Sequence, residues 1–211
     1  MRSTAVVNSA AENAQARTKY MVELALMVAI TLVMAMTPLG YFKTPGLSIT
    51  LLTIPVSIAA IMLGPLGGAV CGTAFGITSF INGFSGAFAS LISINIFGFF
   101  CMTIVARCLE GFLTGLIFKS LHAIKPASKF SFFVSSLACP LLNTLLFMGS
   151  LVLFFYNAPV IQGFVDALGV SNPLTFVFAF VGTQGAIEAI VCCLVATALS
   201  QTLYKVFRKQ G

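Results

Sequence analysis

Charged side chains inside apolar stretches are the residues of this sequence that could hold a ligand. Arg107, Glu110 and Glu188 lie within long apolar runs, and Glu23 lies near the start of another. A charged group at the depth of lipid tails is costly, so such residues usually pair with each other or serve a substrate. A guanidinium binds a carboxylate through two parallel hydrogen bonds, which favours Arg107 as the anchor of an acidic ligand. Arg107 and Glu110 lie three residues apart, so a purely structural pair remains an alternative.

The composition requires a membrane around most of the chain. Its 211 residues are 59% hydrophobic and only 8% charged, with a mean hydropathy of +1.06. Soluble domains carry roughly 25% charged residues, so a soluble globular protein is excluded. Disorder requires low hydrophobicity, and a transmembrane β-barrel requires alternating strands rather than unbroken apolar runs. The basic residues form no single patch, so no nucleic-acid partner is expected.

The sequence predicts an all-α membrane protein in which six transmembrane helices form a single compact bundle. The predicted spans are residues 20–37, 47–63, 69–81, 96–121, 130–156 and 174–206. Residues 64–68 contain Gly and Pro and predict a tight turn, whereas 82–95 and 157–173 predict irregular loops. We expect a cytoplasmic N-terminal segment at 1–19, the substrate-binding bundle at 20–206 and a basic cytoplasmic tail at 207–211.

The distribution of Lys and Arg predicts the orientation, because cytoplasmic loops carry an excess of both. An even number of spans puts both termini on one side of the membrane. The other side has only Lys43 in its loops. Both termini are therefore expected in the cytoplasm of a multi-pass plasma-membrane protein, which we expect to be bacterial. The basic residues on the side of the termini are Arg2, Arg17, Lys19, Lys119, Lys125, Lys129, Lys205, Arg208 and Lys209.

Polar residues on three predicted helices reach a similar depth. Near the inner boundary of the membrane, Lys119 lies 12 residues from Arg107, Phe130 lies 13 residues from Asn143, and Lys205 lies 17 residues from Glu188. At a rise of 1.5 Å per residue, Arg107, Asn143 and Glu188 are then about 18, 20 and 25 Å into the bilayer, in its outer half. We therefore expect a polar pocket that opens outward under the irregular loops. Further candidates for this substrate site are Gln184, Asn82, Asn95, Tyr41 and Lys43.

Catalytic and metal-binding patterns are not found in the sequence. The six cysteines form no CxxC motif or Cys/His cluster, so neither a metal nor a disulfide framework is expected. Residues 83–86 read GFSG, as in intramembrane serine proteases, but a histidine would have to lie beside the serine. The single His122 falls in the opposite, cytoplasmic loop, where we expect it to be solvated. With no phosphate-binding loop either, the chain is expected to be neither an enzyme nor an ATPase, and to need no cofactor.

Small residues recur at four-residue spacing, which allows close approach of helices in lipid. On the third and fourth spans this spacing favours packing within the bundle. The residues concerned are Ala25 and Ala29 on the first span, Gly68, Gly72 and Gly76 on the third, and Gly111 and Gly115 on the fourth.

Several short motifs follow one another along the chain. They are 34–41 (MAMTPLGY), 48–50 (SIT), 54–55 (IP), 63–68 (LGPLGG), 72–76 (GTAFG) and 107–111 (RCLEG), the last followed by Gly115 and Lys119. In this order, and over nearly its whole length, the chain resembles the substrate-binding S components of energy-coupling factor (ECF) vitamin transporters. The resemblance implies a six-span protein that performs no chemistry.

The resemblance also implies a substrate and partners. S components bind a vitamin near the outer face and associate with a transmembrane coupling subunit and two cytoplasmic ATPases, and import involves toppling of the S component. Ala25 and Ala29 match the small-residue motif that docks the coupling subunit. The stretch between the first two spans is most similar to pantothenate S components, although pyridoxine, folate, riboflavin or a thiamin precursor remain alternatives. A stand-alone secondary transporter would show paired repeats, which the sequence lacks.

Overall fold

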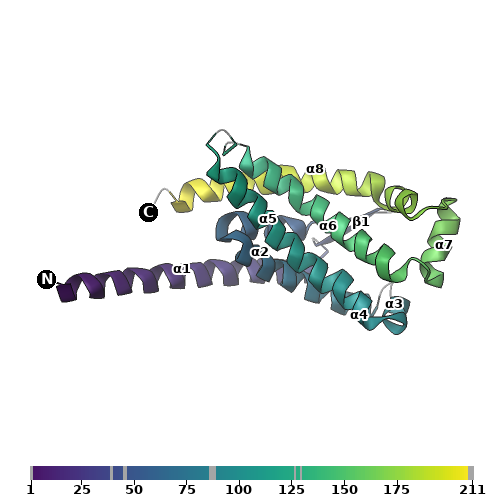
Figure 1. Ribbon diagram of the computed structural model, residues 1–211, viewed down its shortest axis with the longest axis horizontal. Coiled ribbons are helices and arrows are strands. Elements are labelled where there is room, and N and C mark those ends of the chain that lie inside the picture. Colours follow the sequence, from purple (N-terminus) through teal and green to yellow (C-terminus); the bar gives the residue numbers. More distant parts are fainter. Residues whose placement is uncertain are drawn as a thin grey trace.

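The protein is a bundle of long helices with one short β-hairpin, seen in a computed structural model (Figure 1). The structure describes residues 2–38, 40–44, 47–85, 89–125, 127–128 and 130–208. The long helices are α1 (Arg2–Met36), α2 (Thr53–Gly83), α5 (Ala106–Ala123), α6 (Ser131–Phe155) and α8 (Pro173–Arg208). The shorter elements are β1 (Tyr41–Thr44), β2 (Leu47–Thr50), α3 (Ala89–Ile94), α4 (Ile96–Phe100), the π-helix η1 (Cys101–Val105) and α7 (Pro159–Leu168).

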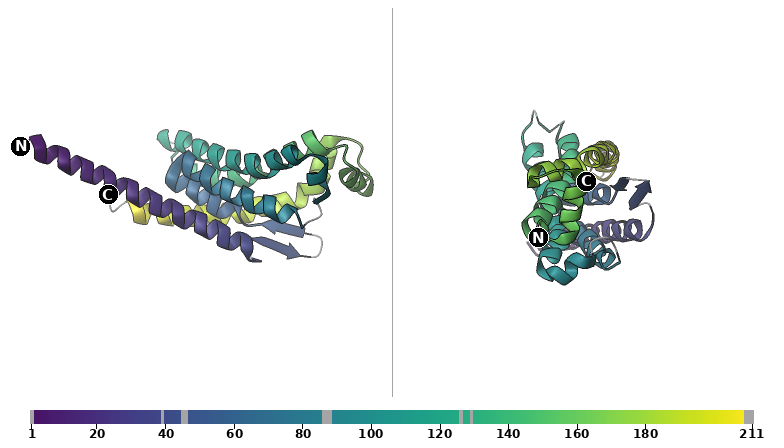
Figure 2. Two further views of the ribbon diagram at one scale, coloured as in Figure 1. Left: turned by 90° about the horizontal axis from the view of Figure 1, so that it is seen from below. Right: turned by 90° about the vertical axis from the view of Figure 1, so that its right-hand side faces the viewer.

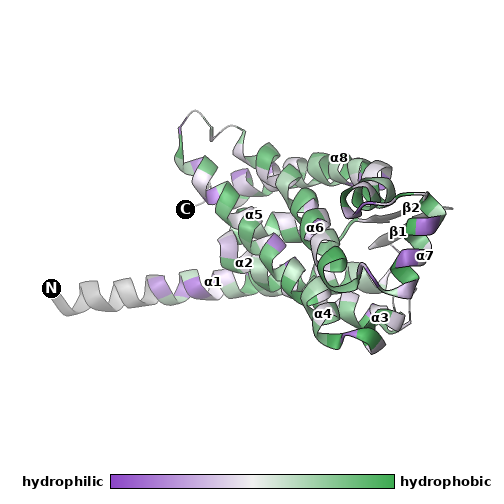
Figure 3. Ribbon diagram, turned by 45° about the vertical axis from the view of Figure 1, so that its right-hand side comes forward, coloured by the Kyte–Doolittle hydropathy of each residue, from purple (hydrophilic) through white to green (hydrophobic). Residues whose placement is uncertain are grey.

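The helices confirm an all-α membrane protein. In the described part of the chain, five helices are long and apolar enough to cross a membrane. By length and composition alone, α7 and the first part of α8, which are bent by 75° at their junction, would also pass as one further span. Apolar residues cover the middle of the bundle, whereas hydrophilic residues collect on the first coloured turns of α1 and on α7 (Figure 3).

Helix α2 consists of two parts that fold back on each other at Gly64. This residue has φ 81° and ψ −171°, which is not helical, and Pro65 follows it. A Cβ atom on Gly68 would lie 2.8 Å from the Cβ of Ala60. In a continuous helix eight residues span about 12 Å, so the chain must reverse between them. The predicted tight turn is therefore confirmed.

The reversal in α2 explains why both ends of the chain lie at one end of the bundle (Figures 1 and 2). The hairpin, α3, α4 and α7 lie at the opposite end. Gly64 lines a cavity together with Lys19 and Lys119, which marks the turn as belonging to the end that holds the termini. We call that end the inner end and the other the outer end, following the positive-inside rule.

Helices α2 and α5 touch through their backbones. A Cβ on Gly72 would overlap the carbonyl oxygen of Arg107, and one on Gly68 would overlap that of Gly111. A Cβ on Gly76 would lie 2.7 Å from the Cα of Ile104 and 2.8 Å from the Thr103 carbonyl oxygen. Only glycine allows such an approach, so the predicted internal packing of these two spans is confirmed.

The outer end is more ordered than the sequence predicted. Strands β1 and β2 pair antiparallel, with Tyr41 opposite Thr50, where a loop and the start of the second span were expected. Helices α3 and α7 occupy the two segments predicted to be irregular. Helix α7 has Pro159 in its first turn and ends at Gly169 with φ 63°, which are ordinary signals for the start and end of a helix.

Candidate substrate-binding site

Arg107 is buried in the bundle directly after the π-helix η1. Its side chain is 7% exposed, and its Nη1 donates a hydrogen bond to the carbonyl oxygen of Met102 at 2.9 Å. The guanidinium carbon lies 4.8 Å from the ring centroid of Phe75 on α2 and 4.7 Å from that of Phe147 on α6. Each ring attracts the cation through its negative face. Arg107 is therefore held between three helices, and π-helical segments of this kind often occur at functional sites.

Glu110 lies one turn further toward the inner end of α5 and is fully buried. Its Oε1 accepts a hydrogen bond from the Sγ of Cys139 on α6 at 3.2 Å. Glu110 interacts electrostatically with both Arg107 and Glu188. From the sequence, Glu110 is expected only as a possible partner of Arg107. In the structure it lies among three helices.

Glu188 brings α8 and the hairpin to the same place. It is 6% exposed, and its Oε2 accepts a hydrogen bond from the backbone N–H of Thr50 at 3.2 Å. Glu188 also interacts electrostatically with Arg107. One guanidinium and two carboxylates, from α5 and α8, thus form a buried cluster, which we call the charge cluster (Arg107, Glu110 and Glu188).

A network of hydroxyl and thiol groups surrounds the charge cluster. Thr53 Oγ1 donates to Cys192 Sγ at 3.0 Å, and Cys192 Sγ contacts the Thr50 carbonyl oxygen at 3.7 Å. Cys139, which donates to Glu110, also contacts the Thr53 carbonyl oxygen at 3.5 Å. The network joins the base of the hairpin to α6 and α8. These residues could not be singled out from the sequence, because a Thr or Cys in an apolar run normally indicates only packing.

Asn143 lies on α6 between the two residues that contact the charge cluster. It is one helical turn from Cys139 and one turn from Phe147, so all three share a face. Asn143 is half-buried, and its buried Oδ1 has no hydrogen-bond partner. Gln184, one turn outward from Glu188 on α8, is also half-buried. The structure therefore brings Arg107 and Glu188 together and places Asn143 against the same region.

The remaining candidates for the substrate site lie nearer the outer end of the bundle. Asn95 caps α4, and its Oδ1 accepts a hydrogen bond from the backbone N–H of Gly98 at 2.9 Å. Asn82 is exposed near the outer end of α2. The backbones of Tyr41 and Lys43 belong to β1, but their side chains lie outside the described residues. Asn95 thus has a local structural role, and Asn82 lies at the surface.

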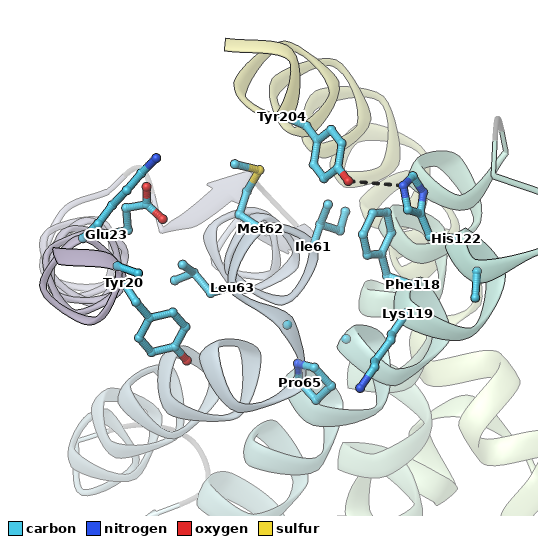
Figure 4. Close-up of a pocket in the computed structure, with 15 residues that line it drawn as sticks. Tyr20, Glu23, Ile61, Met62, Leu63, Pro65, Phe118, Lys119, His122 and Tyr204 are labelled. Carbon is cyan, nitrogen blue, oxygen red and sulfur yellow. Dashed lines mark hydrogen bonds between the residues drawn. The ribbon is translucent and has the colours of Figure 1, made fainter. Parts of the chain in front are cut away.

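The inner end carries a separate cavity of about 700 Å³ between α1, the turn of α2, α5 and α8 (Figure 4). Its charged and aromatic lining includes Tyr20, Glu23, Lys119 and Tyr204. His122 is part of this wall: its Nε2 forms a hydrogen bond with the Tyr204 hydroxyl at 3.2 Å. The expectation that His122 is solvated was wrong, because it is half-buried in an aromatic cluster.

The outward face of α1 is apolar and is not covered by the other residues that the structure describes. Ala25 and Ala29 are exposed on it, and Val22, Leu26 and Val33 are 62%, 56% and 63% exposed. The opposite face packs on the bundle through residues that include Thr31 and Ala35.

A bundle of membrane-spanning helices with a buried charge cluster toward its outer end is typical of a membrane protein that binds a small polar molecule. A family model for the substrate-specific component of ECF transporters matches residues 19–200. The chain therefore belongs to this family: it is a multi-pass transport subunit for a vitamin-type small molecule and associates with ECF partner subunits. No curated protein matches the chain significantly.

Proposed function

We propose that this subunit captures its vitamin at the charge cluster, from the outer side of the membrane. The observation that carries the proposal is the burial of Arg107, Glu110 and Glu188 together beneath the hairpin. Charges at this depth are retained in membrane proteins mainly for function. Asn143, with an unpartnered buried oxygen nearby, adds a group that could orient a ligand.

The hairpin would act as the cover of this site. Thr50, its last residue, donates to Glu188, so the base of the hairpin is attached to a member of the charge cluster. We propose that substrate binding closes the outer part of the hairpin, residues 41–43, over the ligand. Reorientation of the loaded subunit would then be driven by the partner ATPases, and this chain would catalyse no reaction itself.

Pantothenate is the vitamin that the sequence resemblance favours. In this interpretation Arg107 binds the carboxylate, and Asn143 and Glu188 bind hydroxyl and amide groups. Mass spectrometry of the small molecule that co-purifies with the chain would identify the ligand directly. If pantothenate is found, Arg107→Ala should weaken its binding at least tenfold; unchanged affinity would leave Arg107 as a structural partner of Glu110.

The outward face of α1 would dock the transmembrane coupling subunit, which carries two cytoplasmic ATPases. Ala25 and Ala29 supply small side chains in the middle of an exposed apolar surface, which suits close contact with another helix in lipid. The inner cavity lies beside the same helix, since Tyr20 and Glu23 belong to its wall.

Binding and uptake assays separate this function from that of a stand-alone transporter. The purified chain should bind its vitamin in detergent, and liposomes that contain only this chain should show no uptake. Uptake should appear when the coupling subunit, both ATPases and ATP are added. Uptake driven by an ion gradient with the chain alone would contradict the proposal.

A further inference from the structure

Three acceptor oxygens at the charge cluster and on Asn143 have no hydrogen-bond partner among the described residues. Glu110 Oε2, Glu188 Oε1 and Asn143 Oδ1 are buried and have no hydrogen-bond partner. An unsatisfied buried polar atom costs about 1–3 kcal/mol, and more if it is charged. These three oxygens come from α5, α8 and α6, so the unpartnered acceptors belong to the site and not to one helix.

The formal charges of the charge cluster also favour a ligand that carries N–H donors and positive charge. Two carboxyl groups, Glu110 and Glu188, face one guanidinium, so the cluster carries one negative charge in excess when both are ionised. One Nη of Arg107 is already directed at the Met102 carbonyl oxygen. A carboxylate in an apolar interior is stable only with a cation or several donors beside it. An anionic ligand would add to this excess, whereas a cationic ligand would balance it.

The aromatic walls of the cluster hold Arg107. Phe75 and Phe147 present their rings to the Arg107 guanidinium from two sides. Each ring attracts this cation through its negative face. Arg107 then has a structural function, in which it holds the two carboxylates at the site in the absence of substrate.

We infer that the substrate presents N–H donors on a cationic amine or amidine-like group to Glu110 and Glu188, and a further donor to Asn143. This inference rests on the proposed function, because it assumes that the vitamin binds at the charge cluster. It ranks amine-bearing vitamins above pantothenate, whose only charge is negative.

Isothermal titration of the purified full chain in detergent would test the inference. Since the sequence has no tryptophan, a calorimetric readout is preferable to intrinsic fluorescence. The probes are pyridoxamine, whose protonated amine carries N–H donors, and thiamin, whose N–H donors lie on an amidine-like aminopyrimidine beside a thiazolium cation that has none, together with neutral riboflavin and the anions pantothenate and folate. We expect thiamin or pyridoxamine to bind at least tenfold more tightly than any of the other three.

A charge-neutralising variant tests whether the cationic probe binds at Glu188. Glu188→Gln keeps a carbonyl acceptor of similar shape and should lower the affinity for the cationic probe at least tenfold. Glu23→Gln, at the inner end of α1, is the matched control and should leave the affinity unchanged. Because the ranking of probes by the unmodified chain needs no variant, the test stands even if Glu188→Gln fails to fold.

The outcomes separate the inference from the proposed function. Tightest binding of pantothenate, folate or riboflavin would overturn the inference and leave the proposed function intact. The inference would also be overturned if a cationic probe binds tightly and Glu188→Gln does not weaken its binding. The N–H donors of that probe would then face groups other than Glu188. Binding of none of the five vitamins would count against both.

Discussion

Replacement of Gly72 by Ala tests one of the close backbone contacts between α2 and α5. A Cβ at this position would overlap the carbonyl oxygen of Arg107 and lie 2.9 Å from its carbonyl carbon. Both atoms belong to the backbone, so no change of side-chain rotamer can relieve the overlap. Helices α2 and α5 would have to move apart, which would also shift Arg107 within the charge cluster.

The magnitude follows from two opposing effects. Inserting an extra methyl group into a packed interior costs about 1–3 kcal/mol. Alanine recovers roughly 0.5–1 kcal/mol of helix stability relative to glycine. The net loss is then on the order of 1–2 kcal/mol, and each kcal/mol lowers Tm by about 2–4 °C in a protein of this size. We therefore expect Tm to fall by about 2–8 °C.

Thermal unfolding in detergent, followed with a thiol-reactive dye, measures this change. The buried Cys71 and Cys139 become reactive when the bundle opens. Gly149→Ala on α6 is the matched control, because a Cβ there meets no atom within 4 Å. The control should unfold at the same or a slightly higher temperature. Equal Tm values for the two variants would refute the reasoning.

Other positions give equally direct tests. Arg107→Met should destabilise the chain by about 3–5 kcal/mol, because it leaves two buried carboxylates without their cation. Adding Glu110→Gln should restore part of the lost stability. Strict additivity of the two effects on the free energy of unfolding would contradict an interaction between Arg107 and Glu110 in the charge cluster. Gly64→Ala should cost about 1–3 kcal/mol, since φ 81° with ψ −171° is accessible almost only to glycine; an unchanged Tm would argue against the turn. Ala25→Leu with Ala29→Leu should abolish co-purification with the coupling subunit while vitamin affinity is retained, and normal assembly would disprove docking through α1.

The helical class and the turn could be predicted from the sequence because they depend on local signals. Long apolar runs require helices in lipid, and Gly-Pro at 64–65 interrupts one of them. The spacing of Gly68, Gly72 and Gly76 predicted a close helix contact, and the partner proved to be α5 for the first two and the adjoining η1 for Gly76. The depth estimate for Arg107 and Glu188 likewise agrees with their meeting in one cluster.

The hairpin could not be predicted, because its second strand reads as the start of an apolar helix. Residues 47–50 continue directly into the apolar run that forms α2. The bond that fixes the end of this strand joins Thr50 to Glu188, 138 residues away. The role of Cys139 beside Glu110 was missed for the same reason, since the rotation of α6 relative to α5 has no local signal. The burial of His122 depends on Tyr204, which lies on the last helix.

The direct backbone contact between α2 and α5 limits the movements by which the subunit can release its substrate. Helices that interlock through three glycines over two turns can shift only as one rigid body. Arg107 and Glu110 travel with that body, whereas Glu188 belongs to α8 and is tied to the hairpin. Any motion that moves α8 away from this body separates the carboxylate of Glu188 from that of Glu110. A cation bound between the two carboxylates would then lose one of its two partners as the site opens.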